Sequence, residues 1–232
     1  MPESKDPKAL ADIPLFRGLT SGEFSDIAGQ LRHKSFRAGS SVVLAEQSGE
    51  AVYLIGSGAA KVTAEQADGS EVILAILSTG DVIGEMSISE NLPRSATVTT
   101  LDECQMWWLP QKTFQTFLVK YPSLSMNLVR LLSQRLRLAN EQIQALATKD
   151  VEGRVARQLV SLVTAFGTKA PSGEYYLPLR LTQSDIAALT GATRERVNQV
   201  MASYKQRNFL SVDKNHHITV HNWKALVSRT EQ

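Results

Sequence analysis

Residues 182–204 read TQSDIAALTGATRERVNQVMASY, and this stretch decides the fold of the C-terminal part of the chain. Thr182, followed three residues later by Asp185, forms an acidic variant of the capping box that begins helices. The residues behind this cap give a short apolar face: Ile186, Ala187 and Leu189. Gly191 permits a tight turn, and Thr193 is a second N-cap candidate. The stretch therefore predicts two short helices joined at a glycine.

The second predicted helix has two different faces. Apolar residues at helical spacing pack it against the first helix: Val197, Val200, Met201 and Tyr204. The other face carries long polar side chains: Arg194, Glu195, Asn198 and Gln199, with Arg196 on the flank. Such side chains have the donors and acceptors that pair with base edges in the major groove. The combination favours a DNA-binding helix-turn-helix. The alternative from the same pattern is an ordinary helical hairpin with a solvated polar face.

Charge is distributed unevenly along the chain, which at 232 residues is long enough for two domains. Residues 1–150 hold 14 Lys and Arg against 17 Asp and Glu, whereas residues 151–232 hold 11 against 6. The basic excess coincides with the predicted helix-turn-helix, as expected for a module that contacts phosphates.

A single cysteine, Cys104, excludes an intramolecular disulfide and a four-thiolate metal site. We expect a cytoplasmic protein, because no apolar run suggests export or a membrane span. His217 and His221 lie four apart on a predicted strand, about 13 Å from each other, so we expect no metal site. The sequence contains no nucleophile with a general base at the spacing of a catalytic motif, so we do not expect an enzyme.

The N-terminal half has the pattern of a compact antiparallel β-barrel or roll. Apolar runs of strand length alternate with turn signals, at residues 41–45, 51–55, 60–64, 71–77, 96–100 and 105–109. A helix is also expected around residues 21–31. Beyond the helix-turn-helix, residues 210–212 and 217–220 flank a turn and predict a small hairpin, the wing of a winged helix. The fold class is therefore α+β.

A long helix is predicted from about Ser123 to Thr148, between these two regions. One set of apolar residues steps by three and four along it: Val129, Leu132, Leu136, Ala139, Ile143 and Leu146. A second apolar face consists of Leu124, Leu128, Leu131 and Leu138. One face can meet a twin helix and the other the β-domain, which predicts a homodimer; the alternative is a helix buried within one chain. Residues 149–153 break the pattern and form the candidate hinge. The domains expected are 1–122, 123–149 and 150–232.

The segment from Gly80 to Val98 departs from plain strand chemistry. Gly84 allows close backbone approach, Glu85 can accept from a hydroxyl, and Arg94 with Ser95 can hold a phosphate. A sugar phosphate carries both a hydroxyl and a phosphate that these side chains could bind. The residues between Gly84 and Arg94 include the helix or turn formers Asn91-Leu92-Pro93, which suit a short lid that presents backbone amides to an anion. The alternative is that Glu85 and Arg94 form a surface ion pair that closes a turn.

The chain as a whole resembles the CRP/FNR family of bacterial transcription regulators, and within it the cAMP receptor proteins of the catabolite activator type. The resemblance covers about residues 13–227. Its motifs are Gly84-Glu85, Arg94-Ser95-Ala96, the run DVEGRVA at residues 150–156 and the run GATRE at residues 191–195. It implies that the β-roll has the cyclic-nucleotide-binding fold, that the long helix dimerises and that the C-terminal domain is a winged helix-turn-helix.

The resemblance also implies a set of ligand contacts. The cyclic phosphate would meet Arg94 and Ser95, and the ribose hydroxyl would meet Glu85, with backbone help from Gly84 and Met86. The family reads the purine amino group from the long helix with a Thr followed by Ser or Asn. Those places hold Ala139 and Asn140 here, so one adenine contact is missing and the preference for cAMP over cGMP is weakened.

For DNA, the resemblance implies a palindromic operator with TGTGA-like half-sites, read by a homodimer that contacts RNA polymerase through residues 167–174. Arg194 and Glu195 take the places that read guanine and cytosine, and Gln199 replaces a second base-reading Arg. The DNA-contacting residues expected are Thr182, Gln183, Thr193, Arg194, Glu195, Arg196, Asn198 and Gln199. Two alternatives stay open: a regulator of this family that senses another effector such as 2-oxoglutarate, and a nucleotide-binding regulatory subunit that contacts protein.

Overall fold

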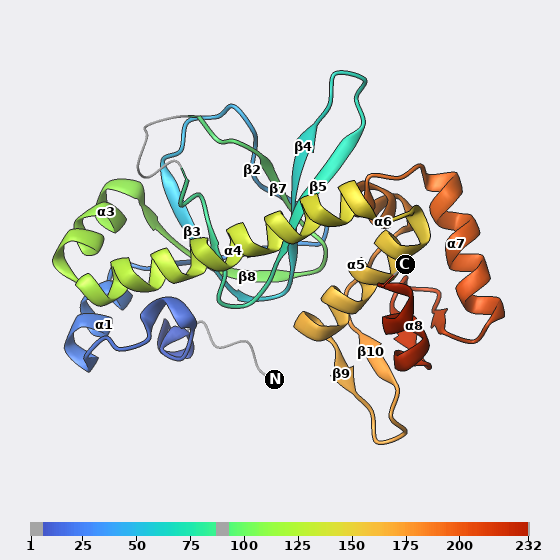
Figure 1. Ribbon diagram of the computed structural model, residues 1–232. Helices are drawn as coiled ribbons and strands as arrows, with labels where there is room; N and C mark the ends of the chain where they lie inside the picture. The colour runs from blue at the N-terminus through green and yellow to red at the C-terminus, as the bar shows by residue number, and fades with distance from the viewer. Residues whose placement is uncertain (1–6, 87–92, 232) are drawn as a thin grey trace. The chain divides into compact units, whose positions relative to one another are not determined.

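The computed structural model describes residues 7–86 and 93–231. The chain divides into two compact units, Met1–Glu65 with Leu74–Leu138, and Gln66–Ile73 with Ala139–Gln232. The boundary falls inside α4 (Pro122–Thr148), the long helix of Figure 1. The division into three domains stays a prediction. No helix in the described ranges is both long and apolar enough to cross a membrane.

Two four-stranded antiparallel sheets form the β-roll, with strand orders β1-β8-β3-β6 and β2-β7-β4-β5. The strands are β1 (Arg32–Phe36), β2 (Ser41–Val43), β3 (Ala51–Ser57), β4 (Ala60–Glu65), β5 (Glu71–Leu77), β6 (Val82–Ile83), β7 (Thr97–Thr100) and β8 (Cys104–Pro110). All six runs predicted as strands are confirmed. β1 was not predicted, because only Phe36 of its five residues is buried and the strand lacks an apolar alternation.

An apolar core lies between the two sheets and includes Ile55, Leu77, Val98, Cys104 and Met106. Burial raises the pKa of the Cys104 thiol to about 12. A second core joins sheet β1-β8-β3-β6 to the helices of the first unit. Trp107 of β8 packs there with Leu124 and Leu128 of α4.

Short helices surround this second core. They are the 3-10 turns Pro7–Leu10 and Pro14–Phe16, α1 (Ser21–Ala28) and α3 (Gln111–Lys120). Thr20 and Glu23 form a complete capping box at the start of α1, so the helix predicted there is confirmed, although it ends three residues early. α3 was not predicted, because a proline rather than a capping side chain precedes it.

α4 has one buried and one exposed apolar face. Leu124 and Leu128 are buried, and Leu131 packs against the same core. The apolar residues that step by three and four along the helix, from Val129 to Leu146, form a seam that is exposed, with Leu136 at 62% and Ile143 at 64%. The helix is therefore not buried within its own chain. The assignment of Leu138 to the buried face was wrong: it is 51% exposed, because it lies beyond the part of the helix that covers the first unit's core.

The second unit contains further helices and strands around α5 (Val151–Phe166), which starts from the N-cap Asp150. The break after α4 is shorter than predicted, because Val151 to Gly153 already belong to α5. The helix-turn-helix consists of α6 (Gln183–Thr190) and α7 (Arg194–Gln206). The wing strands β11 (Leu210–Val212) and β12 (Ile218–Val220) are confirmed, and α8 (Trp223–Arg229) follows.

None of the strands predicted above falls within residues 167–175, which contain strand β9 (Thr168–Lys169) and lead into β10 (Tyr175–Leu177). These two strands extend the wing into a four-stranded sheet of order β11-β12-β10-β9. The ring of Tyr175 packs against that of Trp223, with 4.7 Å between centroids and the planes tilted by 35°. That contact between β10 and α8 has no signal in the local sequence.

Candidate effector and DNA-binding sites

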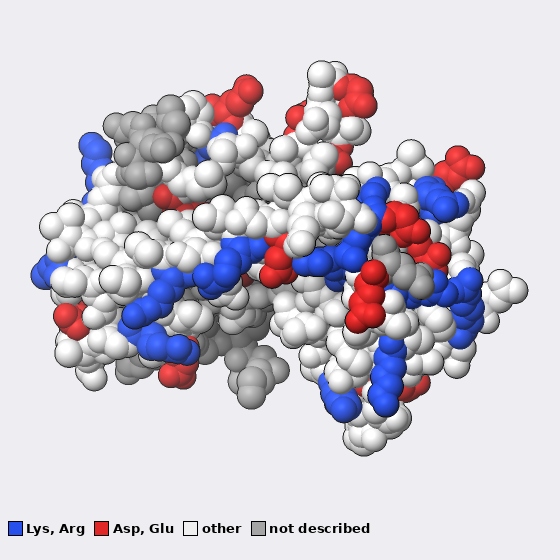
Figure 2. Space-filling view, in the orientation of Figure 1, with Lys and Arg blue, Asp and Glu red and all other residues white. Residues whose placement is uncertain are grey.

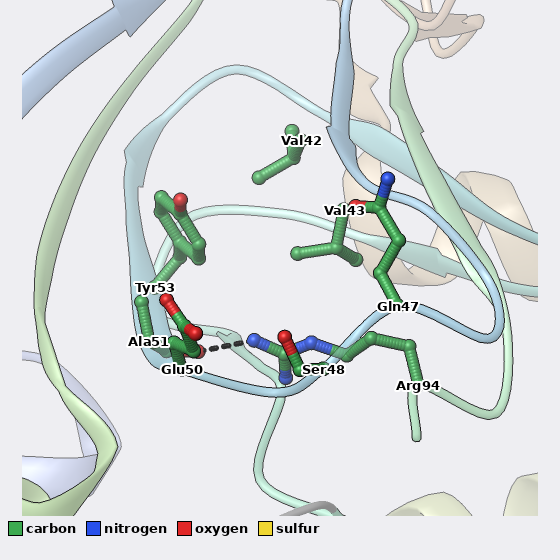
Figure 3. Close-up of a pocket in the computed structure, with 8 residues that line it drawn as sticks. All are labelled: Val42, Val43, Gln47, Ser48, Glu50, Ala51, Tyr53 and Arg94. Atoms are coloured by element: carbon green, nitrogen blue, oxygen red, sulfur yellow. Dashed lines mark hydrogen bonds between the residues drawn. The ribbon is translucent and has the colours of Figure 1, made fainter.

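Arg94 and Glu85, the two charged residues of the predicted effector site, are both buried, but each has a different partner. Only 7% of Arg94 and 9% of Glu85 is exposed. The Arg94 Nη2 donates to the carbonyl oxygen of Ala51 on β3 at 2.5 Å, as Figure 3 shows. Its Nη1 is buried and has no hydrogen-bond partner among the described residues. Burial lowers the pKa of Arg94, yet an arginine remains charged at neutral pH.

The backbone on both sides fixes where this guanidinium lies. The Arg94 N–H donates to the Gln47 carbonyl, and the Glu46 N–H donates to the Arg94 carbonyl, each at 2.9 Å. Gly84 has φ +91°, and a Cβ built on it would overlap the Arg94 Nη1. Glycine is therefore required at residue 84 both for its backbone angle and for the space that the guanidinium occupies.

A cavity of about 190 Å³ opens in front of Arg94. Figure 3 shows the guanidinium reaching across it toward β3. Its lining combines apolar and polar side chains: Val42, Val43, Gln47, Ser48, Glu50, Ala51, Tyr53 and Arg94. A buried cation next to a cavity, with an N–H group that has no partner in the described part of the chain, suits an anionic ligand, because a buried charge is stabilised by a charged partner.

Glu85 is paired with Arg135 of α4, at 2.6 Å from Nη1 to Oε1. Arg135 also reaches Asp81 at 3.1 Å and donates to the Val82 carbonyl at 2.7 Å. The alternative of a surface ion pair between Glu85 and Arg94 was therefore wrong, because both are buried and Glu85 pairs with α4 instead. Sequence reasoning missed Arg135, which lies next to the seam residue Leu136 and looks locally like a solvated helix charge.

The other predicted ligand contacts are more exposed. Met86 is 61% exposed, and the Ser95 hydroxyl lies 3.6 Å from its sulfur. Asn140 and Ala139 are exposed on α4, in the part of that helix that belongs to the second unit. Asn91 and Leu92 of the predicted lid lie outside the described residues.

The helix-turn-helix has the local structure expected from its caps. The Thr182 side chain accepts from the Asp185 N–H, and the Asp185 carboxylate accepts from the Thr182 backbone N–H. Gly191 is left-handed at φ 59°, and the Thr193 side chain accepts from the Arg196 N–H. The predicted apolar face of α7 is buried, and its predicted polar face is exposed: Arg194, Glu195, Arg196, Asn198 and Gln199.

Two pairs of side chains link the polar residues of this surface. Gln183 Nε2 donates to Asn198 Oδ1 at 3.0 Å, and Arg196 Nη1 donates to Gln199 Oε1 at 2.9 Å. Figure 2 shows Lys and Arg side chains along α4 and over helices of the second unit. An exposed row of donors on one helix face can contact both phosphates and base edges of DNA.

Side chains of α4 and α5 hold the end of α6 in place. The last carbonyls of a helix lack partners within it, and here they accept from side chains. Gln142 Nε2 donates to the Leu189 carbonyl at 3.1 Å, and Arg154 Nε donates to the Thr190 carbonyl at 2.8 Å. Arg154 Nη1 donates to the Lys149 carbonyl at 3.0 Å. Arg154, from the DVEGRVA run, thus joins the end of α4 to the helix-turn-helix.

The wing histidines form hydrogen bonds within the wing. His221 Nδ1 lies 2.6 Å from Glu174 Oε1, and its Nε2 lies 2.9 Å from the Ser211 hydroxyl. The bond to His221 lowers the pKa of Glu174. No group of three His, Cys, Asp or Glu side chains suited to a metal ion occurs in the parts of the chain that the structure describes.

Comparison with known proteins places both regions in described families. The cyclic nucleotide-binding domain family matches residues 33–121, and the Crp-like helix-turn-helix domain family matches residues 153–229. A CRP-like cAMP-activated global transcriptional regulator of Mycobacterium tuberculosis is 33% identical over 204 residues, covering 88% of this chain and 91% of that one. A cyclic AMP receptor protein of Thermus thermophilus is 27% identical, covering 81% and 83%.

A solved structure supports the fold. The structure of a CooA mutant from Carboxydothermus hydrogenoformans has a TM-score of 0.75 at 24% identity, and the match covers 94% of this chain and 96% of that one.

Proposed function

Because the chain belongs to the CRP/FNR family of non-enzymatic, DNA-binding transcription regulators, we propose that it is a cytoplasmic homodimer whose affinity for its operator is set by cAMP. One observation supports the choice of effector: the buried guanidinium of Arg94 lies beside the cavity, and its Nη1 has no hydrogen-bond partner among the described residues. A ligand phosphate would supply the missing negative charge.

The proposed cyclic phosphate meets Arg94 and Ser95, and the ribose hydroxyl meets Glu85, with backbone contacts from Gly84 and Met86. Arg135 already holds Glu85 at 2.6 Å, so a ribose hydroxyl would share that carboxylate with α4. Ligand binding at Glu85 would thereby act on the long helix directly.

The base contact is proposed for Asn140, whose amide can both donate and accept. Ala139 cannot contribute a hydroxyl, so discrimination between cAMP and cGMP would rest on fewer contacts than in the rest of the family. We favour cAMP because relatives such as that of Mycobacterium tuberculosis are named as cAMP-activated.

The proposed dimer interface is the exposed apolar seam of α4. Val129, Leu132, Leu136, Ile143 and Leu146 are each between 38% and 64% exposed, on one stripe at coiled-coil spacing. Large exposed apolar stripes usually mark an interface. Leu136→Glu is expected to give a monomer in analytical ultracentrifugation, whereas Val119→Glu, at an 87% exposed position on α3, should leave a dimer. Two dimeric variants would contradict the interface.

On DNA, we propose that Thr182, Gln183 and Thr193 contact the backbone near the helix N-termini while α7 reads the major groove. The two recognition helices of the dimer would meet half-sites about one DNA turn apart. Gln142 of α4 donates to the Leu189 carbonyl, and Arg154 donates to the Thr190 and Lys149 carbonyls. These hydrogen bonds connect the end of α4 to the helix-turn-helix. The β9–β10 hairpin with residues 167–174 is the proposed contact for RNA polymerase.

Titration calorimetry of the full chain against cAMP, cGMP and 2-oxoglutarate tests the effector. We expect saturable heat with cAMP that is lost in Arg94→Ala. Heat with 2-oxoglutarate alone would favour the other type of effector. Unaltered cAMP affinity in Arg94→Ala would refute the phosphate assignment.

Gel shifts with a palindromic TGTGA-type operator, with and without cAMP, test the output. We expect a shift that cAMP strengthens over random DNA of the same length. Nucleotide binding without any selective shift would instead favour a regulatory subunit that contacts protein.

A further inference from the structure

Two exposed carboxamides of α7, those of Asn198 and Gln199, have their oxygens engaged by neighbouring side chains. Asn198 Oδ1 accepts from Gln183, and Gln199 Oε1 accepts from Arg196, at 3.0 and 2.9 Å. In each case the –NH2 end of the carboxamide is left as the group available to a ligand. Neither partnership follows from the resemblance to the family.

Gln199 lies at the centre of the face that α7 presents. The buried side is formed by Val197, Val200, Met201 and Tyr204. At 100° per residue, Glu195 and Gln199 lie opposite this side, whereas Arg196 lies at its edge. Arg196 can therefore hold Gln199 from the flank without occupying the centre of the face.

The engaged oxygen changes what Gln199 can read. A glutamine pairs with adenine by donating to N7 and accepting from the N6 amino group, so it needs its oxygen. Guanine presents the acceptors N7 and O6, and thymine presents O4, so a donor alone suffices for them. A glutamine whose oxygen is held by Arg196 thus matches guanine or thymine better than adenine.

We propose that Arg196 is a positioning residue that fixes Gln199 as a hydrogen-bond donor and so determines the base preferred at the pair under Gln199. The proposal rests on the proposed reading of DNA by α7. The hydrogen bond to Gln199 is charge-assisted, and an arginine at the edge of the groove also gains from nearby phosphates. Both effects keep Arg196 in place when DNA is bound.

The test is a competition binding experiment with the cAMP-loaded full chain and an operator library in which each half-site position is varied in turn. Gln199→Ala first identifies the contacted pair, as the position where base preference is lost. At that pair we expect the wild type to prefer guanine or thymine over adenine. In Arg196→Met, the relative affinity for adenine should rise about fivefold or more, since a bidentate glutamine–adenine pair becomes available. Lys205→Ala, which removes an exposed charge of the same helix without touching a carboxamide, should leave the preference unchanged.

Different outcomes separate the possible failures. The same base ranking in the wild type and Arg196→Met, or a uniform loss of affinity on every library member, would overturn the proposal and leave Arg196 as a phosphate contact. A wild type that prefers adenine at the identified pair would also overturn it. A wild type that selects no library member over random DNA would instead refute the proposed function. Arg196 is exposed, so the variant is expected to fold, and its circular dichroism spectrum checks this.

Discussion

The two candidate sites both use arginine to meet an anion, but they place it in opposite environments. Arg94 is 7% exposed, and its position depends on the Ala51 carbonyl, on the backbone of residues 46 and 47 and on the missing Cβ of Gly84. Arg194 is exposed on α7 and depends only on the helix that carries it. A buried cation needs a fold built around it, because desolvation must be offset by polar contacts.

The two sites should therefore differ in how substitutions change stability and ligand affinity. In the effector site, ligand affinity and the packing of the β-roll depend on the same atoms. On α7, a polar side chain can change without disturbing the core, because surface substitutions away from special features usually alter stability little. Matched substitutions in the two regions test this difference.

The largest effect is expected from Arg94→Ala. Removing one partner of a buried charge-assisted contact typically costs about 2–5 kcal/mol of binding, so cAMP affinity should fall about 30-fold or more. Calorimetry measures this loss, and gel shifts should still show weak, salt-sensitive DNA binding. Stability should fall as well, because the same side chain holds the Ala51 carbonyl and packs against Gly84. An Arg94→Ala variant as stable as the wild type would contradict this contrast with α7.

Gly84→Ala compared with Gly173→Ala separates backbone strain from crowding. Both glycines have φ +91°, but a Cβ at Gly84 would overlap Arg94, whereas nothing lies within 4 Å of one at Gly173. We expect Gly173→Ala to lower the free energy of unfolding by about 1–2 kcal/mol and Gly84→Ala by about 2–4 kcal/mol. Urea denaturation measures both, and only Gly84→Ala should weaken cAMP binding. Equal losses would show that Arg94 moves aside freely.

Arg194→Ala tests the exposed counterpart. We expect a loss of about 1–3 kcal/mol on the cognate operator and little loss on random DNA, because a base contact is removed. Thermal stability should stay unchanged within about 0.5 kcal/mol. Fluorescence anisotropy with both DNAs measures the two affinities, and an equal loss on both would show that Arg194 contacts only phosphates.

The smallest effect is expected where a residue other than glycine adopts a positive φ. Glu46 has φ 65° beside Arg94, and Asn208 has φ 55° after α7. Glu46→Gly should stabilise the protein by up to about 1 kcal/mol, because glycine relieves the left-handed strain but loses more chain entropy. Asn208→Gly should give a smaller gain, since asparagine tolerates this conformation. Urea denaturation compares them, and a destabilised Glu46→Gly variant would contradict this account.

Most of the helix-turn-helix and the strands of the β-roll could be predicted from the sequence. Thr182, Asp185 and Thr193 form the caps expected of them, and the buried face of α7 is the one that helical spacing indicates. The failures share a cause. β1 and α3 carry no strong local pattern, and the β9–β10 hairpin is stabilised by pairing with β12 and by packing against α8.

The sequence by itself determined the helix-turn-helix, most strands of the β-roll and the burial of one face of α7. These follow from hydrogen bonds and side-chain periodicity within a few residues, so neighbours along the chain suffice. Only the tertiary structure decided that Glu85 pairs with Arg135, 50 residues away, and that Arg154 holds the end of α6, 36 residues away. A buried charge and a carbonyl at a helix end both need a hydrogen-bond partner, and the packing of elements distant in sequence determines which side chain lies close enough to provide it.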